Sequence, residues 1–170
     1  MSKVTALSIS VGIFGLLSTL MTATVWPLPV WVLFLAWASF FFAGGGWAGL
    51  VKSVACNWTG MLIATATLLS VQATSSAIWL SVAVGIGSFA MVQASRISWI
   101  SAAPAIVFGF AMTVGTMSAT GSPITTVGAS HPAVVAAITA LVGACYGLAS
   151  EWGAAVILRA FGSRSATQPA

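Results

Sequence analysis

Few side chains in this sequence could take part in acid–base, nucleophilic or metal chemistry. Glu151 is its only carboxylate side chain and His131 is its only histidine. Cys56 and Cys145 both lie in apolar runs, without the spacing of a metal site or of a disulfide framework. Because a nucleophile, a base and an orienting group cannot be assembled from this set, we expect no enzyme activity, no metal and no cofactor.

Glu151 is the most informative of these residues, because it stands eight positions before Arg159 in an apolar run. At 1.5 Å per helical residue, it would lie about 12 Å inward from a helix end near Arg159. A carboxylate at that depth needs a partner or a proton. Two interpretations are open: a structural ion pair with Lys52, and a charged vestibule or proton-linked site near Tyr146 and Ser150.

Polar side chains also gather on one helical stretch in the first half of the chain. Because a helix turns about 100° per residue, they fall on one face or beside it. This face comprises Ser53, Asn57 and Gly60, with Lys52, Cys56 and Thr59 adjoining it. Polar groups at membrane depth turn inward. Ser53, Asn57 and Thr59 therefore predict either hydrogen bonds between helices or the lining of a solute path.

The glycine run Gly44-Gly45-Gly46 precedes this face. With Gly49 it has the letters of a dinucleotide fingerprint, but no βαβ pattern surrounds it, and Leu50 stands where a phosphate-binding loop needs lysine. One interpretation is a tight turn, in which glycine reaches positive φ. The other is a broken or re-entrant segment, whose backbone survives at membrane depth only if it lines water or is buried. In that case Gly44, Gly45 and Gly46 would line the path together with Glu151.

The composition determines the class of protein that must position these residues. Charged residues make up 4% of the sequence and hydrophobic residues 59%, whereas soluble domains average about a quarter charged. The chain therefore predicts an all-α, polytopic membrane protein with the lipid bilayer as its partner. Its five cations are spread along the chain without a cluster, which excludes a nucleic-acid surface.

Six apolar segments can be drawn between breakers such as Pro27, Pro29 and the glycine run. They are Val4–Val25, Leu28–Ala43, Leu50–Leu69, Ser76–Ala94, Ser98–Thr116 and Pro132–Leu158. Pro104 is expected to interrupt the fifth segment as a kink or half-helix break. Residues 1–161 form the single predicted membrane domain, and residues 162–170 a polar tail that we expect to be disordered.

The cations predict the orientation of these six crossings. With the N-terminus inside, all five fall on one side of the membrane, and the opposite loops carry none. These cations are Lys3, Lys52, Arg96, Arg159 and Arg164. This is the distribution that the positive-inside rule requires, so the predicted topology is N-in and C-in.

A short internal echo pairs Val11-Gly12-Ile13 with Val84-Gly85-Ile86. It suggests two halves of three helices each, which would be inverted in the membrane because three is odd. The later segments do not line up at the same offset, so the sequence does not decide whether the two halves are related.

The stretch Phe40–Gly46, followed by Gly49–Ser53, resembles a family of small bacterial inner-membrane proteins catalogued as domain of unknown function 1097. Ser101–Gly109 and Leu7–Gly15 are also similar to segments of this family, and the resemblance extends to about Ala160. It implies a location in the bacterial inner membrane. It brings no substrate or catalytic residue that could be assigned to this chain.

Three functions remain open from the sequence. The first is a channel or facilitator for a small solute, neutral rather than strongly charged, because intramembrane charges are scarce. The second is a non-transporting scaffold or accessory subunit, and the third is a proton-coupled transporter that uses Glu151. Small residues such as Gly143 and Gly147 let helices approach closely, and we expect a homo-oligomer. The sequence does not identify the solute.

Overall fold

The computed structural model describes residues 1–72 and 76–161, and every regular element in these ranges is helical. The α-helices are α1 (Lys3–Thr24), α2 (Val30–Phe42), α3 (Gly46–Gln72), α4 (Ala77–Ala94), α5 (Ala103–Thr120) and α6 (Pro132–Phe161), with a 3₁₀ turn, η1 (Ser98–Ile100), before α5. The predicted all-α class and six helices are confirmed. The predicted disordered tail, residues 162–170, lies outside the described residues.

The fifth helix differs most from its predicted bounds. It begins at Ala103, and η1 occupies the place where its first turn was expected. Pro104, expected to interrupt a helix, lies instead in the first turn of α5. The reason is that a first turn does not use the N–H that proline lacks, and the fixed φ of proline suits that position.

Five of the described helices, α1, α3, α4, α5 and α6, are long and apolar enough to cross a membrane. α2 has 13 residues, or about 20 Å at 1.5 Å per residue, which is less than a hydrocarbon core of about 30 Å. A bilayer can thin around a short helix. Six crossings and the N-in, C-in topology therefore stay predictions.

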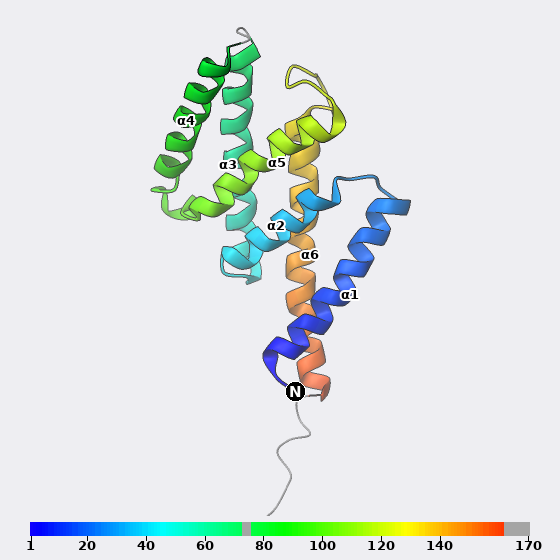
Figure 1. Ribbon diagram of the computed structural model, residues 1–170. Helices are drawn as coiled ribbons and strands as arrows, with labels where there is room; N and C mark the ends of the chain where they lie inside the picture. Colours follow the sequence, from blue (N-terminus) through cyan, green and yellow to red (C-terminus); the bar gives the residue numbers. More distant parts are fainter. Residues whose placement is uncertain (73–75, 162–170) are drawn as a thin grey trace, which may run out of the picture.

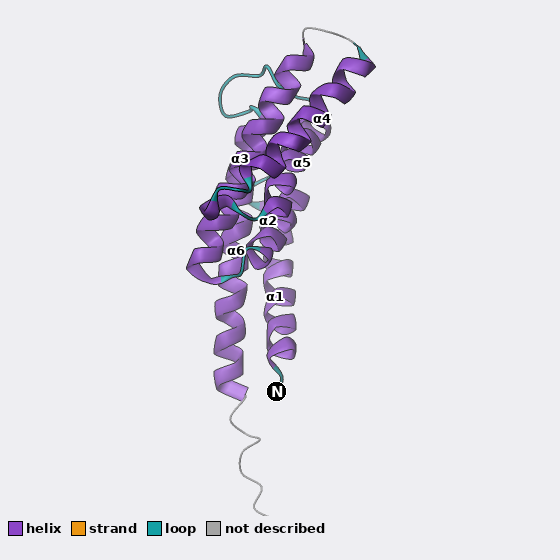
Figure 2. Cartoon of the chain, turned by 90° about the vertical axis from the view of Figure 1, so that its left-hand side faces the viewer, coloured by secondary structure: helices purple, strands orange, loops and turns teal. Residues whose placement is uncertain are grey.

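The helices pack as a long bundle in which α2 and α5 lie diagonally across α3 and α6 (Figure 1). α1 runs beside the C-terminal part of α6, whereas α4 runs beside α3. Figure 2 shows the same bundle from the side, with α1 and α6 again side by side. The central core, shared by α2, α3, α5 and α6, consists of Val32, Ala36, Met61, Met112, Ala136 and Ala140.

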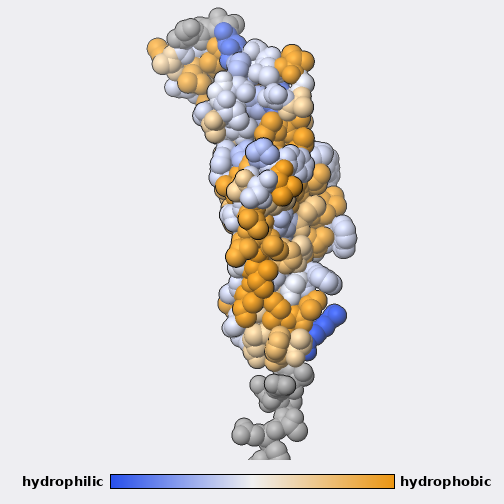
Figure 3. Space-filling view, turned by 90° about the vertical axis from the view of Figure 1, so that its right-hand side faces the viewer, coloured by the Kyte–Doolittle hydropathy of each residue, from blue (hydrophilic) through white to orange (hydrophobic). Residues whose placement is uncertain are grey.

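The outer surface of the bundle is largely apolar. Large hydrophobic side chains such as Leu16, Leu62 and Ile86 are more than half exposed. Figure 3 shows apolar side chains running along one face, with strongly hydrophilic groups near its two ends. Lipid tails can cover such a surface at no cost, whereas water cannot.

Glycines set the closest approaches between helices. A Cβ atom at Gly60 would collide with the backbone carbonyl of Ile106 in α5, and one at Gly109 would collide with the backbone of Asn57 in α3. Gly143 in α6 meets the carbonyl of Leu33 in α2 in the same way. These glycines therefore serve packing within one chain.

We predict that Gly60→Ala destabilises the protein, because α3 and α5 would have to separate to admit the new methyl group. The expected loss is about 1–3 kcal/mol, read as a lower thermal unfolding midpoint in detergent. Gly12→Ala is the matched control, because a Cβ at Gly12 would have nothing within 4 Å. Equal midpoints for the two variants would contradict this account of the α3–α5 crossing.

Candidate functional site

The most unusual polar group in the interior is the amide of Asn57. Asn57 in α3 and Ser39 in α2 are both fully buried, and Ser39 Oγ lies 3.0 Å from Asn57 Oδ1, to which it donates. Asn57 Nδ2 is buried with no hydrogen-bond partner. A buried N–H without a partner loses its bonds to water and gains none in return.

Two local features bring Ser39 and Asn57 together. The turn between α2 and α3 reverses the chain, so that Ser39 in α2 lies against Asn57 in α3, which follows it by only 18 residues in the sequence. On the other side of Asn57, Gly109 lets the α5 backbone approach α3 without a side chain between them. The amide therefore lies where three helices meet.

The hydroxyl groups of Ser53 and Thr59, which the sequence placed on the same polar face, have hydrogen-bond partners, unlike Asn57 Nδ2. Ser53 is buried and donates to the carbonyl of Leu50 at 3.0 Å. Thr59 donates to the carbonyl of Ala55 at 2.8 Å. Both hydroxyls are satisfied inside α3 and need no partner on another helix.

Sequence reasoning missed Ser39, although a signal was present. Ser39 is the only hydroxyl residue in α2, whose other residues are aliphatic or aromatic. A lone serine in a fully apolar helix has a polar group that a neighbouring helix can use. Its partner could not be identified without the fold.

The glycine run forms the tight turn between α2 and α3. Gly44, Gly45 and Gly46 have φ of 106°, 69° and 62°, values that side chains other than glycine rarely adopt. α3 begins at Gly46 itself, directly after the turn. Of the two interpretations of the sequence, a tight turn and a broken or re-entrant segment, the tight turn therefore describes the structure of Gly44–Gly46.

Glu151 caps this turn. Gly46 N donates to Glu151 Oε2 at 2.7 Å, and both carboxylate oxygens lie 3.1 Å from where a Cβ of Gly45 would stand. A carboxylate at a helix N-terminus complements the positive end of the helix dipole. Glu151 is solvent- or lipid-exposed in the bundle, not buried as its position in the apolar run suggested.

None of the residues expected to accompany Glu151 bonds to it in the described part of the chain, and two of them, Ser150 and Tyr146, have other partners. The contacts of the described residues include no ion pair between Lys52 and Glu151. Ser150 Oγ accepts from Trp37 Nε1 at 3.0 Å, and Tyr146 packs its ring against Phe14 and Trp37. A proton-linked role for Glu151 stays a prediction.

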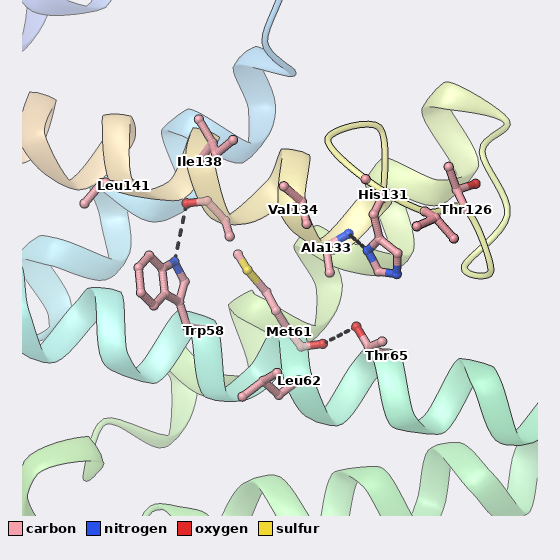
Figure 4. Close-up of a pocket in the computed structure, with 13 residues that line it drawn as sticks. Trp58, Met61, Leu62, Thr65, Thr126, His131, Ala133, Val134, Ile138 and Leu141 are labelled. Carbon is pink, nitrogen blue, oxygen red and sulfur yellow. Dashed lines mark hydrogen bonds between the residues drawn. The ribbon is translucent and has the colours of Figure 1, made fainter.

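An apolar groove of about 1010 Å³ lies between α3, α6 and the loop that precedes α6 (Figure 4). Trp58 and Leu62 line it from α3, whereas Ile138 and Leu141 line it from α6. Trp58 Nε1 donates across it to the carbonyl of Ala137 at 3.4 Å. The groove holds none of the predicted site residues, and its apolar lining suits lipid or another helix.

Taken together, an almost uncharged chain, five apolar helices of spanning length and an apolar outer surface define a multi-pass membrane protein. Residues 8–155 match the model of the family described as "Protein of unknown function (DUF1097)", and the chain belongs to this family. The resemblance inferred from the glycine-rich motif is thereby confirmed.

The chain is also similar to "Uncharacterized protein YahC" of Escherichia coli (strain K12). The two are 32% identical over 164 residues, which cover 90% of this chain and 92% of the relative. No solved structure matches the chain.

We predict that Glu151→Ala lowers stability, because the N–H of Gly46 loses its acceptor. The expected loss is about 0.5–2 kcal/mol, the range for a lost N-cap, and thermal unfolding in detergent would measure it. Glu151→Gln keeps an acceptor oxygen and should lose less. Lys52→Ala is the decisive control: if it destabilised the protein as much as Glu151→Ala, an ion pair rather than the helix cap would explain Glu151.

Proposed function

We propose that the protein is a facilitator in the bacterial inner membrane that lets a small, uncharged polar solute cross the bilayer. The observation that supports this proposal is the unpartnered Nδ2 of Asn57, buried at the meeting point of α2, α3 and α5. The alternative use of a buried amide is to join helices. Ser39 in α2 already makes such a bond by donating to the amide oxygen of Asn57 in α3. The amide N–H of Asn57 is left free.

The cost of the free N–H supports a functional role. An unmet buried polar group costs about 1–3 kcal/mol, and polar residues inside membrane proteins are expensive and mark solute paths. Thr116 Oγ1 in α5 is a second buried atom without a partner. A solute with a carbonyl or hydroxyl oxygen could accept from either group.

The charges of the interior favour an uncharged solute. The buried polar side chains of the described residues are serine, threonine and asparagine, all of them neutral. A charged solute in a medium of low dielectric would need an opposite charge beside it. A neutral molecule needs only hydrogen-bonding partners, which this interior supplies.

Flux measurements on proteoliposomes test the proposal. We expect glycerol, urea or small amides to enter vesicles that hold the protein faster than empty vesicles, as followed by light scattering after an osmotic step. Asn57→Ala should lower the protein-dependent flux roughly tenfold, the effect of about 1.4 kcal/mol.

The matched control for this experiment is Ser53→Ala. Ser53 is as buried as Asn57 but is satisfied inside its own helix, so its loss should leave the flux nearly unchanged. If none of these solutes, nor simple ions, crossed faster than in empty vesicles, the proposed function would be wrong.

A second candidate function is a non-transporting scaffold, and the apolar groove between α3 and α6 favours it. A Cβ at Gly12 or at Gly85 would have nothing within 4 Å, so these small-residue positions are free for another helix. Purification in mild detergent tests this candidate. A stoichiometric partner protein that Leu62→Arg or Ile138→Arg in the groove removes would support it, whereas a chain that purifies alone would contradict it.

A further inference from the structure

The packing of the six helices repeats between the two halves of the chain. α1 packs against α6 as α4 packs against α3, and α2 packs against α6 as α5 packs against α3. The contact between α2 and α3 has its counterpart in the contact between α5 and α6. Exchanging the halves leaves this set of contacts unchanged, as a half-turn about an axis between α3 and α6, perpendicular to the view of Figure 1, would do.

Most buried positions of the first two helices repeat at one fixed shift, with Ala6 and Trp37 as the exceptions. A shift of 73 residues carries the echo Val11-Gly12-Ile13 onto Val84-Gly85-Ile86, and it also carries buried positions of α1 and α2 onto buried positions of α4 and α5. The matched pairs are Ser10 with Ala83, Ser18 with Met91, Val32 with Ala105, Leu33 with Ile106, Ala36 with Gly109, Ser39 with Met112 and Phe40 with Thr113.

The third helices repeat at a shift of 83 residues. Every buried position of α6 then coincides with a buried position of α3. The pairs are Gly49 with Pro132, Ser53 with Ala136, Cys56 with Thr139, Asn57 with Ala140, Gly60 with Gly143, Met61 with Ala144, Ala64 with Gly147 and Thr67 with Ser150. Ten extra residues fall between Thr113 and Pro132, which is why a single offset could not align the whole chain.

The tightest crossings confirm this register independently of burial. Gly60 in α3 packs on the carbonyl of Ile106 in α5, and Gly143 in α6 packs on the carbonyl of Leu33 in α2. Gly60 and Gly143 are equivalent at the shift of 83, whereas Leu33 and Ile106 are equivalent at the shift of 73. The same backbone contact is thus built twice.

We propose that the two halves are an inverted repeat, and that the Ser39–Asn57 pair, where the halves differ, is a binding site for the hydrogen-bond acceptor of an uncharged solute. With three crossings in each half, the halves lie in opposite orientations in the membrane. Many transporters are built from such repeats and bind their substrates at the repeat interface near the midplane. The site rests on the proposed function, but the repeat does not.

The second half shows that the fold does not need this polar pair. The equivalents of Ser39 and Asn57 are Met112 and Ala140, two apolar side chains of the same buried core. The same arrangement of helices is therefore built there without an amide or a hydroxyl. A polar pair that packing does not require, and that leaves one N–H unmet, is suited to recognise a solute.

The site is covered in this structure, because Ser39 and Asn57 are both fully buried. A solute can reach Nδ2 only when α2 or α5 moves away from α3. Because the halves are equivalent, the same kind of helix pair can separate on either side of the interface between the two halves. The inverted repeat therefore provides a way to open the site to each side of the membrane in turn.

The decisive variant copies the second half onto the first. We expect S39M/N57A to fold, with the elution volume of the wild type and a thermal unfolding midpoint within a few degrees of it. Its flux of glycerol, urea or small amides should fall to that of empty vesicles. A folded double variant with unchanged flux would overturn the site.

A second variant keeps the site testable if the larger side chain introduced by S39M prevents folding. Asn57→Ala adds no volume and removes the donor, and its folded form should show the roughly tenfold loss of flux given above. Unchanged flux in a folded Asn57→Ala variant would overturn the site equally. If the wild type itself carried no solute, the proposed function would fail, whereas the repeat would stand or fall by the labelling below.

Labelling of single cysteines tests the inverted repeat without any solute. In a background of Cys56→Ala and Cys145→Ala, the equivalent exposed positions Thr24 and Ile97 are replaced by cysteine one at a time. A membrane-impermeant maleimide should label one in intact cells and the other only after permeabilisation. Labelling of both from the same side, as five crossings with an uncrossed α2 would give, would overturn the inverted arrangement.

Discussion

The bundle depends on close contact between helix backbones. In a lipid environment, helices gain nothing by burying apolar surface against one another, because lipid tails are equally apolar. Dispersion between closely fitting surfaces must then hold the helices together, and a gap of about 0.5–1 Å already removes a quarter to a half of this attraction. Gly60, Gly109 and Gly143 supply that fit. The position of Asn57, where α2, α3 and α5 meet, follows from these crossings.

Because the helices cross so closely, the type of a buried polar side chain determines whether it finds a hydrogen-bond partner. Most hydroxyl side chains donate to a carbonyl of their own helix, as Ser53 and Thr59 do in α3, whereas Ser10 and Ser39 donate to another helix. An amide cannot be satisfied in this way, because it has both a donor and an acceptor end and a longer reach. Asn57 needs two partners from other elements, and the structure provides one. The chemistry of asparagine, rather than polarity in general, distinguishes this position.

The sequence predicted the class and most helix bounds, since a scarcity of charge and the placing of breakers are local properties. It placed the start of α3 at Leu50 rather than Gly46, because the acceptor that caps Gly46 comes from Glu151, more than 100 residues away. It grouped Ser53 and Thr59 with Asn57, because a helical face does not show which hydroxyls bond to their own helix. It could not pair Ser39 with Asn57, because that contact depends on the angle of the glycine turn.

Glu151 and His131, the two ionisable side chains considered first for chemistry, each accept a hydrogen bond from a backbone N–H at the start of a helix. Each third helix of the repeat begins with N–H groups that lack partners, and these are costly where water is scarce. α3 follows a short glycine turn with no capping side chain of its own, and it uses the carboxylate of Glu151 from α6.

α6 follows a longer loop, and His131 there accepts from the backbone N–H of Ala133 through Nδ1 at 3.1 Å. The position equivalent to Glu151 is Leu68, which is apolar because α6 needs no acceptor from α3. The extra residues before α6 thus explain both the broken alignment of the halves and the absence of a carboxylate at position 68. With Glu151 and His131 serving as caps, the unmet hydrogen-bonding capacity of the interior is concentrated in its neutral side chains, which is where a neutral solute would be recognised.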